Sequence, residues 1–116
     1  TDRVDGLEGK VAIVTDDMID TAGTLVSVAE VIKASGARKI IVAATHGILS
    51  DPAAERIQAS SIDKIFVTDT IPNEQAKQQL GDRLEVVTIH HLLANSISRI
   101  ANGGSVSDLF NGRNYK

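Results

Sequence analysis

Three carboxylates and two threonine hydroxyls gather within nine consecutive residues of this chain. The segment runs from Asp16 to Thr24 and reads Asp-Asp-Met-Ile-Asp-Thr-Ala-Gly-Thr. Carboxylates this close together repel one another, and an apolar core gives no reason to gather them. We therefore expect a cationic or hydroxyl-rich ligand beside Asp16, Asp17 and Asp20.

The second half of the segment has the composition of an anion-binding turn. Its residues are small or carry hydroxyl groups: Thr21, Ala22, Gly23 and Thr24. At a helix N-terminus, backbone N–H groups and hydroxyls can surround a phosphate, and a glycine lets the backbone approach it closely. The acidic half suits sugar hydroxyls or hydrated Mg²⁺, so the segment predicts a phosphorylated sugar as ligand. A helix cap formed by Asp20 or Thr21 would explain one carboxylate and leave two without a role.

Four short apolar runs are typical of strands that are buried on both faces of a parallel sheet. They lie at residues 11–15, 39–44, 62–67 and 84–89, and the first leads directly into the acidic segment. Parallel strands need crossover connections, which the helix patterns between the runs supply. The predicted fold class is therefore α/β, an open, mostly parallel sheet flanked by helices, in a single domain over residues 1–116.

The helices are predicted from apolar spacing and from residues typical of helix ends. Residues 25–32 have apolar side chains at i, i+3, i+4 and i+7, and Gly36 ends that helix. Asp51 is the expected N-cap of a short second helix, with Pro52 as its first residue. Two more helices are expected near 73–80 and from about 91 to 102, the last with Leu93, Ile97 and Ile100 on one face. Ligands of such sheets bind beyond the carboxyl ends of the strands, where the acidic segment lies.

Composition narrows the classes of function. The 116 residues carry 12 Lys+Arg and 15 Asp+Glu, a formal net charge of −3, so we expect no basic surface for nucleic acid. The sequence has no cysteine, and three histidines are a poor inventory for a zinc site. No apolar run approaches the roughly 18 residues of a membrane span, and the opening residues do not resemble a signal peptide. We expect a cytoplasmic protein with neither nucleic acid nor membrane as partner.

The segment from Asp16 to Thr24 resembles the phosphoribosyl diphosphate binding motif of the type I phosphoribosyltransferase fold, in the form used by ribose-phosphate diphosphokinase (PRPP synthetase). Residues 44–47, 67–72 and 102–110 agree with that family in order and spacing, so the likeness runs from about Gly9 to Phe110. It covers only the C-terminal domain of that enzyme, whose N-terminal catalytic half is absent from this chain. The resemblance implies a three-layer, phosphoribosyltransferase-like fold.

The resemblance also implies an activity in nucleotide biosynthesis. The family transfers diphosphate from ATP to C1 of ribose 5-phosphate, with Mg²⁺. Asp16 and Asp17 would contact the ribose hydroxyls and could reach Mg²⁺ through water. The 5-phosphate would be held by Asp20, Thr21, Ala22, Gly23 and Thr24.

The end of the chain matches a regulatory segment of the same family. In feedback-inhibited members, a nucleotide or phosphate binds at a subunit interface to the positions matched by Ser105, Val106, Ser107 and Phe110. This match, like the family itself, implies a homo-oligomer for the full enzyme.

The residues that the resemblance does not supply bear on activity. The family's Mg²⁺-ligating His, its catalytic-loop Lys and Arg, and most of its ATP contacts lie upstream of the matching part. None of His46, His90 and His91 stands at the position of that metal ligand. We therefore expect no catalytic residue in this chain, ATP bound through the missing half, and no diphosphoryl transfer by the chain alone.

Other functions compete with this interpretation. A receiver-type phosphoacceptor signalling domain has about this length, and Asp16, Asp17 and Asp69 could mimic its acidic site. It needs a Lys after its last strand, where this chain has His90 and His91. A non-catalytic regulatory paralogue of the synthetase would keep the fold and change the role. A phosphoribosyltransferase that transfers to a base is less favoured, because the Met-Ile pair and the closing Ser-Val-Ser are of the synthetase type.

Three histidines remain as secondary candidates. A lone His46 after the second strand is more often a loop or interface residue than a catalytic base. His90 and His91 begin the last helix, where a positive charge is unfavourable, so we expect surface residues.

Overall fold

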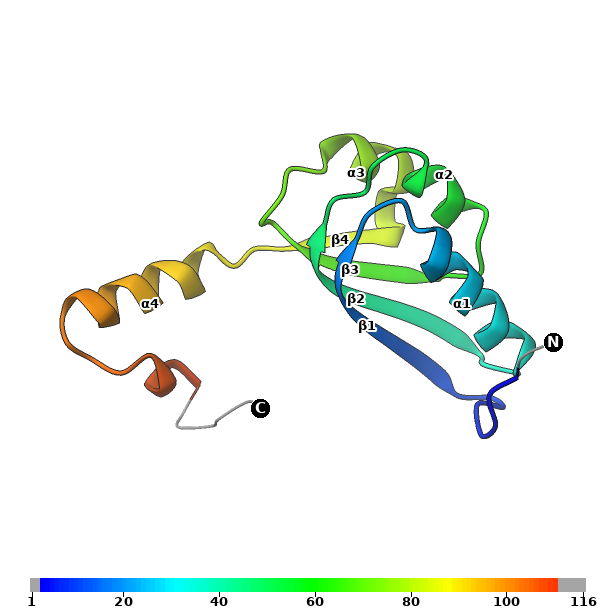
Figure 1. Cartoon of the computed structure of the whole chain (residues 1–116), viewed down its shortest axis with the longest axis horizontal. Helices are drawn as coiled ribbons and strands as arrows, with labels where there is room; N and C mark the ends of the chain where they lie inside the picture. Colours follow the sequence, from blue (N-terminus) through cyan, green and yellow to red (C-terminus); the bar gives the residue numbers. More distant parts are fainter. Residues whose placement is uncertain (1–2, 111–116) are drawn as a thin grey trace.

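The computed structural model describes residues 3–110 of the 116-residue chain. Its strands are β1 (Val11–Ile19), β2 (Lys39–Gly47), β3 (Lys64–Thr68) and β4 (Leu84–Val87). The helices that connect them are α1 (Gly23–Ala34), α2 (Ala53–Gln58) and α3 (Glu74–Leu80), and a short 3-10 helix, η1 (Gly81–Arg83), leads into β4. After β4 come α4 (His90–Ala101) and a second 3-10 helix, η2 (Val106–Phe110), as Figure 1 shows.

The sheet is parallel throughout, with its strands in the order β1-β2-β3-β4. Each crossover therefore moves one strand further in the same direction. Because such crossovers are right-handed, α1, α2 and α3 must all lie on one face of the sheet, and Figure 1 shows them there. The predicted α/β class with a parallel sheet and flanking helices is confirmed. Among residues 3–110 the helices that pack on the sheet form one layer, so this part of the chain builds two layers and not the three that the family resemblance implies.

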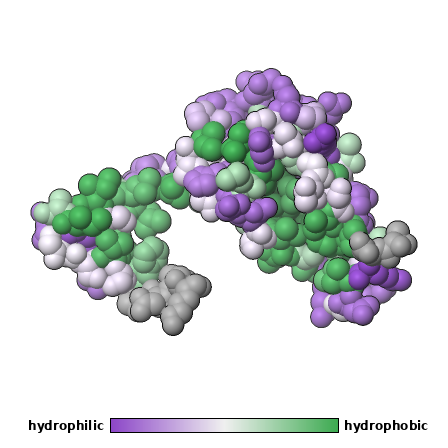
Figure 2. Space-filling model, in the orientation of Figure 1, coloured by the Kyte–Doolittle hydropathy of each residue, from purple (hydrophilic) through white to green (hydrophobic). Residues whose placement is uncertain are grey.

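The core lies between the sheet and these three helices. Strand residues that face the helices are at most 1% exposed: Ile40, Val42, Ile65, Val67 and Leu84. Side chains alternate along a strand, so their neighbours lie on the other face, where Ile13 is 68% and Val87 48% exposed. The prediction that the strands are buried on both faces is therefore wrong for this second face, because none of α1–α3 covers it. Figure 2 shows hydrophobic surface over the strands and along α4.

The last helix stands apart from the sheet. No residue of α4 is buried, and its apolar face is open, with Leu93 51%, Ile97 66% and Ile100 69% exposed. The Cα radius of gyration is 16.9 Å, against about 13 Å for a compact chain of this length. The predicted fold class places helices along the sheet, whereas α4 follows β4 and projects beyond it (Figure 1). Within the described residues, no helix has the length and apolarity needed to cross a membrane.

Two boundaries differ from the predicted ones near the carboxyl edge of the sheet. β1 continues to Ile19, because Met18 and Ile19 pair with the extended end of β2. Asp16 and Asp17 consequently lie inside the strand. The second helix begins at Ala53, and its N-cap is Pro52 rather than Asp51. A turn bond from the Ala53 N–H to the Ser50 oxygen, 2.8 Å long, replaces the expected side-chain cap.

Candidate functional site

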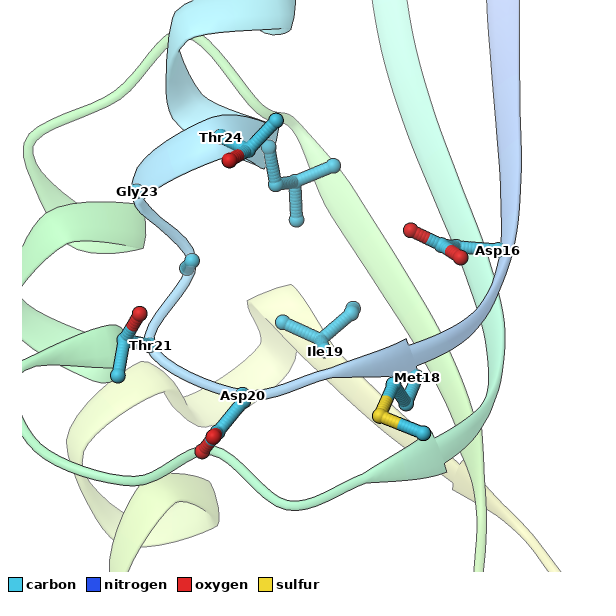
Figure 3. Close-up of a pocket in the computed structure, with 9 residues that line it drawn as sticks. Asp16, Met18, Ile19, Asp20, Thr21, Gly23 and Thr24 are labelled. Carbon is cyan, nitrogen blue, oxygen red and sulfur yellow. The ribbon is translucent and has the colours of Figure 1, made fainter.

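The segment singled out in the sequence forms a pocket at the carboxyl edge of β1. The cavity has a volume of about 220 Å³, below the ~300–1,000 Å³ of pockets that hold drug-sized ligands. A single phosphate or pentose suits this size better than a whole nucleotide. The lining residues are Asp16 and Met18 to Leu25 (Figure 3). All five predicted phosphate-binding residues are among them, together with one of the two predicted ribose-binding residues.

The acidic pair is divided between the two faces of the sheet. Asp16 lines the pocket and points into it (Figure 3). Asp17 does not line it, because successive side chains of a strand point to opposite faces. The backbone N–H of Asp17 donates to Asp16 Oδ1 at 2.7 Å, which fixes that carboxylate beside its own strand. The third carboxylate, Asp20, lies at the rim and is directed away from Thr24 (Figure 3).

The turn into α1 depends on a residue in an unusual backbone conformation. Ala22 has φ 65° and ψ 11°, in the left-handed region, and it is the N-cap residue of α1. This conformation costs a residue with a Cβ roughly 1–2 kcal/mol, yet the Ala22 methyl is buried and packs in the core. No side chain caps the helix, so the interpretation of Asp20 or Thr21 as a simple helix cap is wrong.

In the described part of the chain, no hydrogen bond pairs the first amides of α1 with a backbone oxygen. Within residues 3–110, the first backbone bond of the helix is donated by the Val26 N–H to the Ala22 oxygen at 3.0 Å. The N–H groups of residues 23–25 precede it and are among the orphan donors of a helix N-terminus. Gly23 and Thr24 both line the cavity. Amides and a hydroxyl at this position can bind an anionic oxygen.

Arg56 joins this turn from another helix. Its Nη1 donates to the backbone oxygen of Thr21 at 3.1 Å. A Cβ placed on Gly23 would lie 3.1 Å from the same nitrogen. No sequence pattern indicates Arg56, because nothing in the spacing of α2 connects it to a turn 35 residues away.

His46 belongs to a polar network beside the pocket. Its Nδ1 lies 2.8 Å from Thr70 Oγ1, and the Thr68 hydroxyl donates to the Thr45 oxygen at 2.6 Å. His46 is not a pocket-lining residue. His46 lies within β2 and connects it to the segment after β3, so it is not the loop residue expected from the sequence, and the interface interpretation remains a prediction.

Asp69, which follows β3, accepts hydrogen bonds from the segment between β4 and α4. A hydrogen bond from Thr88 and another from the backbone N–H of Ile89, 3.0 Å long, lower the pKa of its carboxyl group below the ordinary value of 3.8. Because β2 lies between β1 and β3, Asp69 is not on a strand adjacent to that of Asp16. Receiver domains use the order 2-1-3-4-5, in which the first and third strands are neighbours. The strand order therefore argues against the receiver alternative.

The remaining candidates from the sequence lie in α4 and in the segment after it, residues 102–110. His90 and His91 are exposed, as expected, and their rings are in tilted contact, with centroids 4.1 Å apart and an interplanar angle of 44°. Ser105 and Ser107 share a hydrogen bond of 2.7 Å, and η2 packs against α4 through an ion pair between Arg99 and Asp108 at 3.4 Å. The predicted regulatory residues Ser105, Val106, Ser107 and Phe110 are thus together at one end, apart from the pocket (Figure 1). Their regulatory role remains a prediction.

The acidic side chains of the site could supply only part of a metal site. No group of three or more His, Asp or Glu side chains that could hold a metal occurs in the described part of the chain. Mg²⁺ commonly uses one or two carboxylates, several waters and substrate phosphates. Asp16 is exposed and forms no ion pair within residues 3–110, whose ion pairs are Lys64–Glu85 and Arg99–Asp108. It therefore fits an Mg²⁺ held through water and shared with a ligand.

Comparison with protein families gives a match over nearly the whole chain. The sequence model of the family described as phosphoribosyl synthetase-associated domain matches residues 2–111. A ribose-phosphate pyrophosphokinase of Aquifex aeolicus is 49% identical over 109 residues, covering 94% of this chain and 34% of the relative. One from Corynebacterium glutamicum is 40% identical over 109 residues, covering 94% of this chain and 33% of the relative.

A solved structure gives the same result for the fold. The crystal structure of phosphoribosylpyrophosphate synthetase from Mycobacterium smegmatis superposes with a TM-score of 0.80 at 40% identity, covering 87% of this chain and 33% of that one. The chain spans about a third of the length of the relatives it matches.

Proposed function

This chain belongs to the phosphoribosyl synthetase-associated domain family, and we propose that it is the ribose 5-phosphate and phosphoribosyl diphosphate binding domain of a ribose-phosphate diphosphokinase. The full enzyme would transfer diphosphate from ATP to C1 of ribose 5-phosphate. Catalysis of phosphoryl transfer depends largely on positioning, so a domain that holds the acceptor sugar contributes directly to the rate.

The observation that supports the proposal is the set of side chains and backbone groups that line one small cavity. Asp16 reaches it from β1, while Gly23 and Thr24 reach it from the first turn of α1. The two sides have opposite chemistry: a carboxylate accepts hydrogen bonds from sugar hydroxyls, and amide N–H groups donate to phosphate oxygens. A sugar phosphate uses both sides at once, whereas a free phosphate would gain nothing from the carboxylate.

We assign the first ribose contact to Asp16 and the 5-phosphate contacts to the turn Thr21–Thr24. Asp17 stays a prediction for the ribose hydroxyls, because it extends from the opposite face of the strand. Asp20 remains a predicted phosphate-site residue whose backbone leads into the turn. When bound, Mg²⁺ would neutralise charge between ligand phosphates, with Asp16 as a water-mediated contact.

We further propose that residues 1–116 correspond to the C-terminal domain of the enzyme. The chain matches about a third of the length of its relatives, and the placement at their C-terminal end rests on the sequence resemblance described above. The residues that bind ATP and promote the transfer would then lie in another part of the enzyme. Homo-oligomer formation and binding of a regulator near Ser105–Phe110 belong to the same proposal.

Calorimetric titration with ribose 5-phosphate tests the binding role. Thr24→Ala removes one hydroxyl from the phosphate side, and we expect about tenfold weaker binding, the typical effect of losing a hydrogen bond to a charged group. Gly23→Val places a branched side chain in the turn, and we expect a larger loss. Thr45→Ala, in β2 and outside the pocket lining, is the matched control and should bind like the wild type. Unchanged affinity in both turn variants would refute the assignment.

An assay of the enzyme separates the catalytic role from the alternative of a regulatory paralogue. This chain supplied with ATP, Mg²⁺ and ribose 5-phosphate should form no phosphoribosyl diphosphate, whereas a full-length synthetase that contains it should do so. A full-length protein that binds the sugar phosphate and forms no product would favour the regulatory paralogue.

A further inference from the structure

We propose that Arg56 is a positioning residue for the phosphate-binding turn, Thr21–Thr24, a role that rests on the ribose 5-phosphate binding proposed above. Arg56 is in α2, next to α1 on the same face of the sheet. Its guanidinium reaches the turn from outside the cavity, of which it is not a lining residue. It would act on the ligand through the turn.

The first contact is a hydrogen bond to the backbone. Arg56 Nη1 donates to the Thr21 oxygen at 3.1 Å. That oxygen belongs to the peptide group that joins Thr21 to Ala22, whose φ is 65°. A residue held in a sparsely populated conformation persists only where its surroundings fix it. The bond from Arg56 orients the peptide that enters this conformation.

The second contact lies on the other side of the same residue. A Cβ built on Gly23 would meet Arg56 Nη1 at 3.1 Å and Cζ at 3.8 Å. The guanidinium therefore packs closely against the backbone that leads out of the strained residue. Arg56 thus bonds to the turn before Ala22 and lies beside Gly23 after it, next to the pocket that Gly23 and Thr24 line.

The charge of Arg56 adds an electrostatic reason. The ion pairs within residues 3–110 are Lys64–Glu85 and Arg99–Asp108, so the Arg56 charge is not neutralised by a carboxylate of the described chain. Asp16 and Asp20 line the pocket and would repel a phosphate dianion. A cation bonded to the turn opposes this repulsion. The planar guanidinium also holds its donors in a fixed fork, which an ammonium does not.

Three variants of this chain test the proposal by calorimetric titration with ribose 5-phosphate and, separately, inorganic phosphate. Arg56→Met removes the donors and the charge and keeps an unbranched side chain. Arg56→Lys keeps the charge and one flexible donor group. Arg83→Met is the matched control, because Arg83 Nη1 donates to the Ile57 and Gln58 oxygens of α2 at 3.1 and 3.0 Å and does not contact the turn.

We expect Arg56→Met to weaken binding of ribose 5-phosphate about tenfold, as for loss of a charged hydrogen-bond partner, and Arg56→Lys to weaken it about threefold. Arg83→Met should change the affinity for ribose 5-phosphate less than twofold, even if it lowers the urea midpoint as much as Arg56→Met does. A merely structural role would make affinity follow the urea midpoint in all three variants, and that result overturns the proposal. Equal binding by Arg56→Met and wild type overturns it while leaving the proposed function intact. Failure of the wild type to bind overturns both.

A double-mutant cycle with Gly23→Ala checks the geometry in the unfolding equilibrium. In the wild type, the added methyl meets Arg56 at 3.1 Å and should lower the urea midpoint. In an Arg56→Ala background that neighbour is gone, and the same change should be neutral or stabilising, as alanine is favoured over glycine in a helix. Additive effects of the two substitutions would show that the guanidinium does not pack on the turn, and would overturn the proposal.

Discussion

Single residues at the carboxyl edge of β1 decide what the pocket can bind. Asp16 and Asp17 are chemically identical, and the alternation of the strand gives them different surroundings. Ala22 adopts a left-handed conformation while its methyl is buried in the core. Glycine would relieve the backbone cost and lose the methyl packing, so the choice of alanine favours a turn with one conformation. A rigid turn loses less conformational entropy when it binds an anion.

The lowered pKa of Asp69 predicts how the stability of the fold changes with pH. Its folded-state pKa is lowered by the Thr88 hydroxyl first and the Ile89 amide second. A carboxyl group with a lowered pKa stabilises the fold above its unfolded pKa, near 3.8, and this contribution is lost as the pH falls through the lower folded value. The free energy of unfolding, measured with urea from pH 6 to about pH 2, should therefore fall less in Asp69→Asn than in the wild type.

A second variant assigns this effect to its main cause. Thr88→Val removes the hydroxyl that contributes most to the lowered pKa and should also flatten the acid limb of the stability profile. Parallel profiles for the wild type and Asp69→Asn would contradict the prediction.

The contact between β2 and β3 shows how two elements set the edge that carries the site. Gly47 ends β2, and a Cβ on it would lie 2.9 Å from Val67 Cγ1 and 3.1 Å from Val67 Cβ. Val67 is 1% exposed and β-branched, so it has little freedom to move away. Glycine therefore lets the end of β2, which pairs with Ile19 of β1, pass close to the Val67 side chain of β3.

Gly47→Ala is expected to destabilise the fold by about 1–3 kcal/mol, the usual cost of overpacking a core. Urea denaturation followed by circular dichroism measures this free energy of unfolding. Gly104→Ala is the control, because its added Cβ would have no neighbour closer than 3.5 Å, and its φ is not in the left-handed region. We expect the control to change stability by no more than about 0.5 kcal/mol. Equal effects of the two substitutions would contradict the close approach of Gly47 to Val67.

In the described part of the chain, helices cover one face of the sheet and leave the other face exposed. Every crossover places its helix on the same side, so the strands are covered there and open on the other (Figure 1). Hydrophobic residues are consequently exposed over the strands and along α4 (Figure 2). The burial of a strand residue is thus decided by its face rather than by its type.

Two isoleucines in neighbouring strands test this difference. Ile40 is fully buried against the helices, whereas Ile13 is 68% exposed on the open face. Ile40→Ala should cost about 2–5 kcal/mol of unfolding free energy, as for other large-to-small core substitutions, and Ile13→Ala no more than about 1 kcal/mol. Urea titration at two protein concentrations measures both values. Equal costs, or a cost for Ile13→Ala that grows with concentration, would mean that the open face is covered in solution.

Local sequence patterns predict the class of the fold and the segment that lines the pocket. Unbroken apolar runs, helix spacing and the Asp16–Thr24 segment are local patterns, and local patterns predict elements and their order. The residues predicted from them to form the anion-binding turn, Thr21 to Thr24, line the pocket, as does Asp20, which the family resemblance adds. Nothing local, however, distinguishes Asp16 from Asp17, because the point where β1 ends depends on its pairing with β2.

The positions of the elements relative to one another follow only from the tertiary structure. Strand order determined which face is covered, and α4, which follows β4, extends beyond the sheet instead of packing on it. The tertiary structure also brings Arg56 to a turn 35 residues away. These features arise from contacts between distant parts of the chain, whose free energy depends on pairing and packing rather than on the sequence around any one residue.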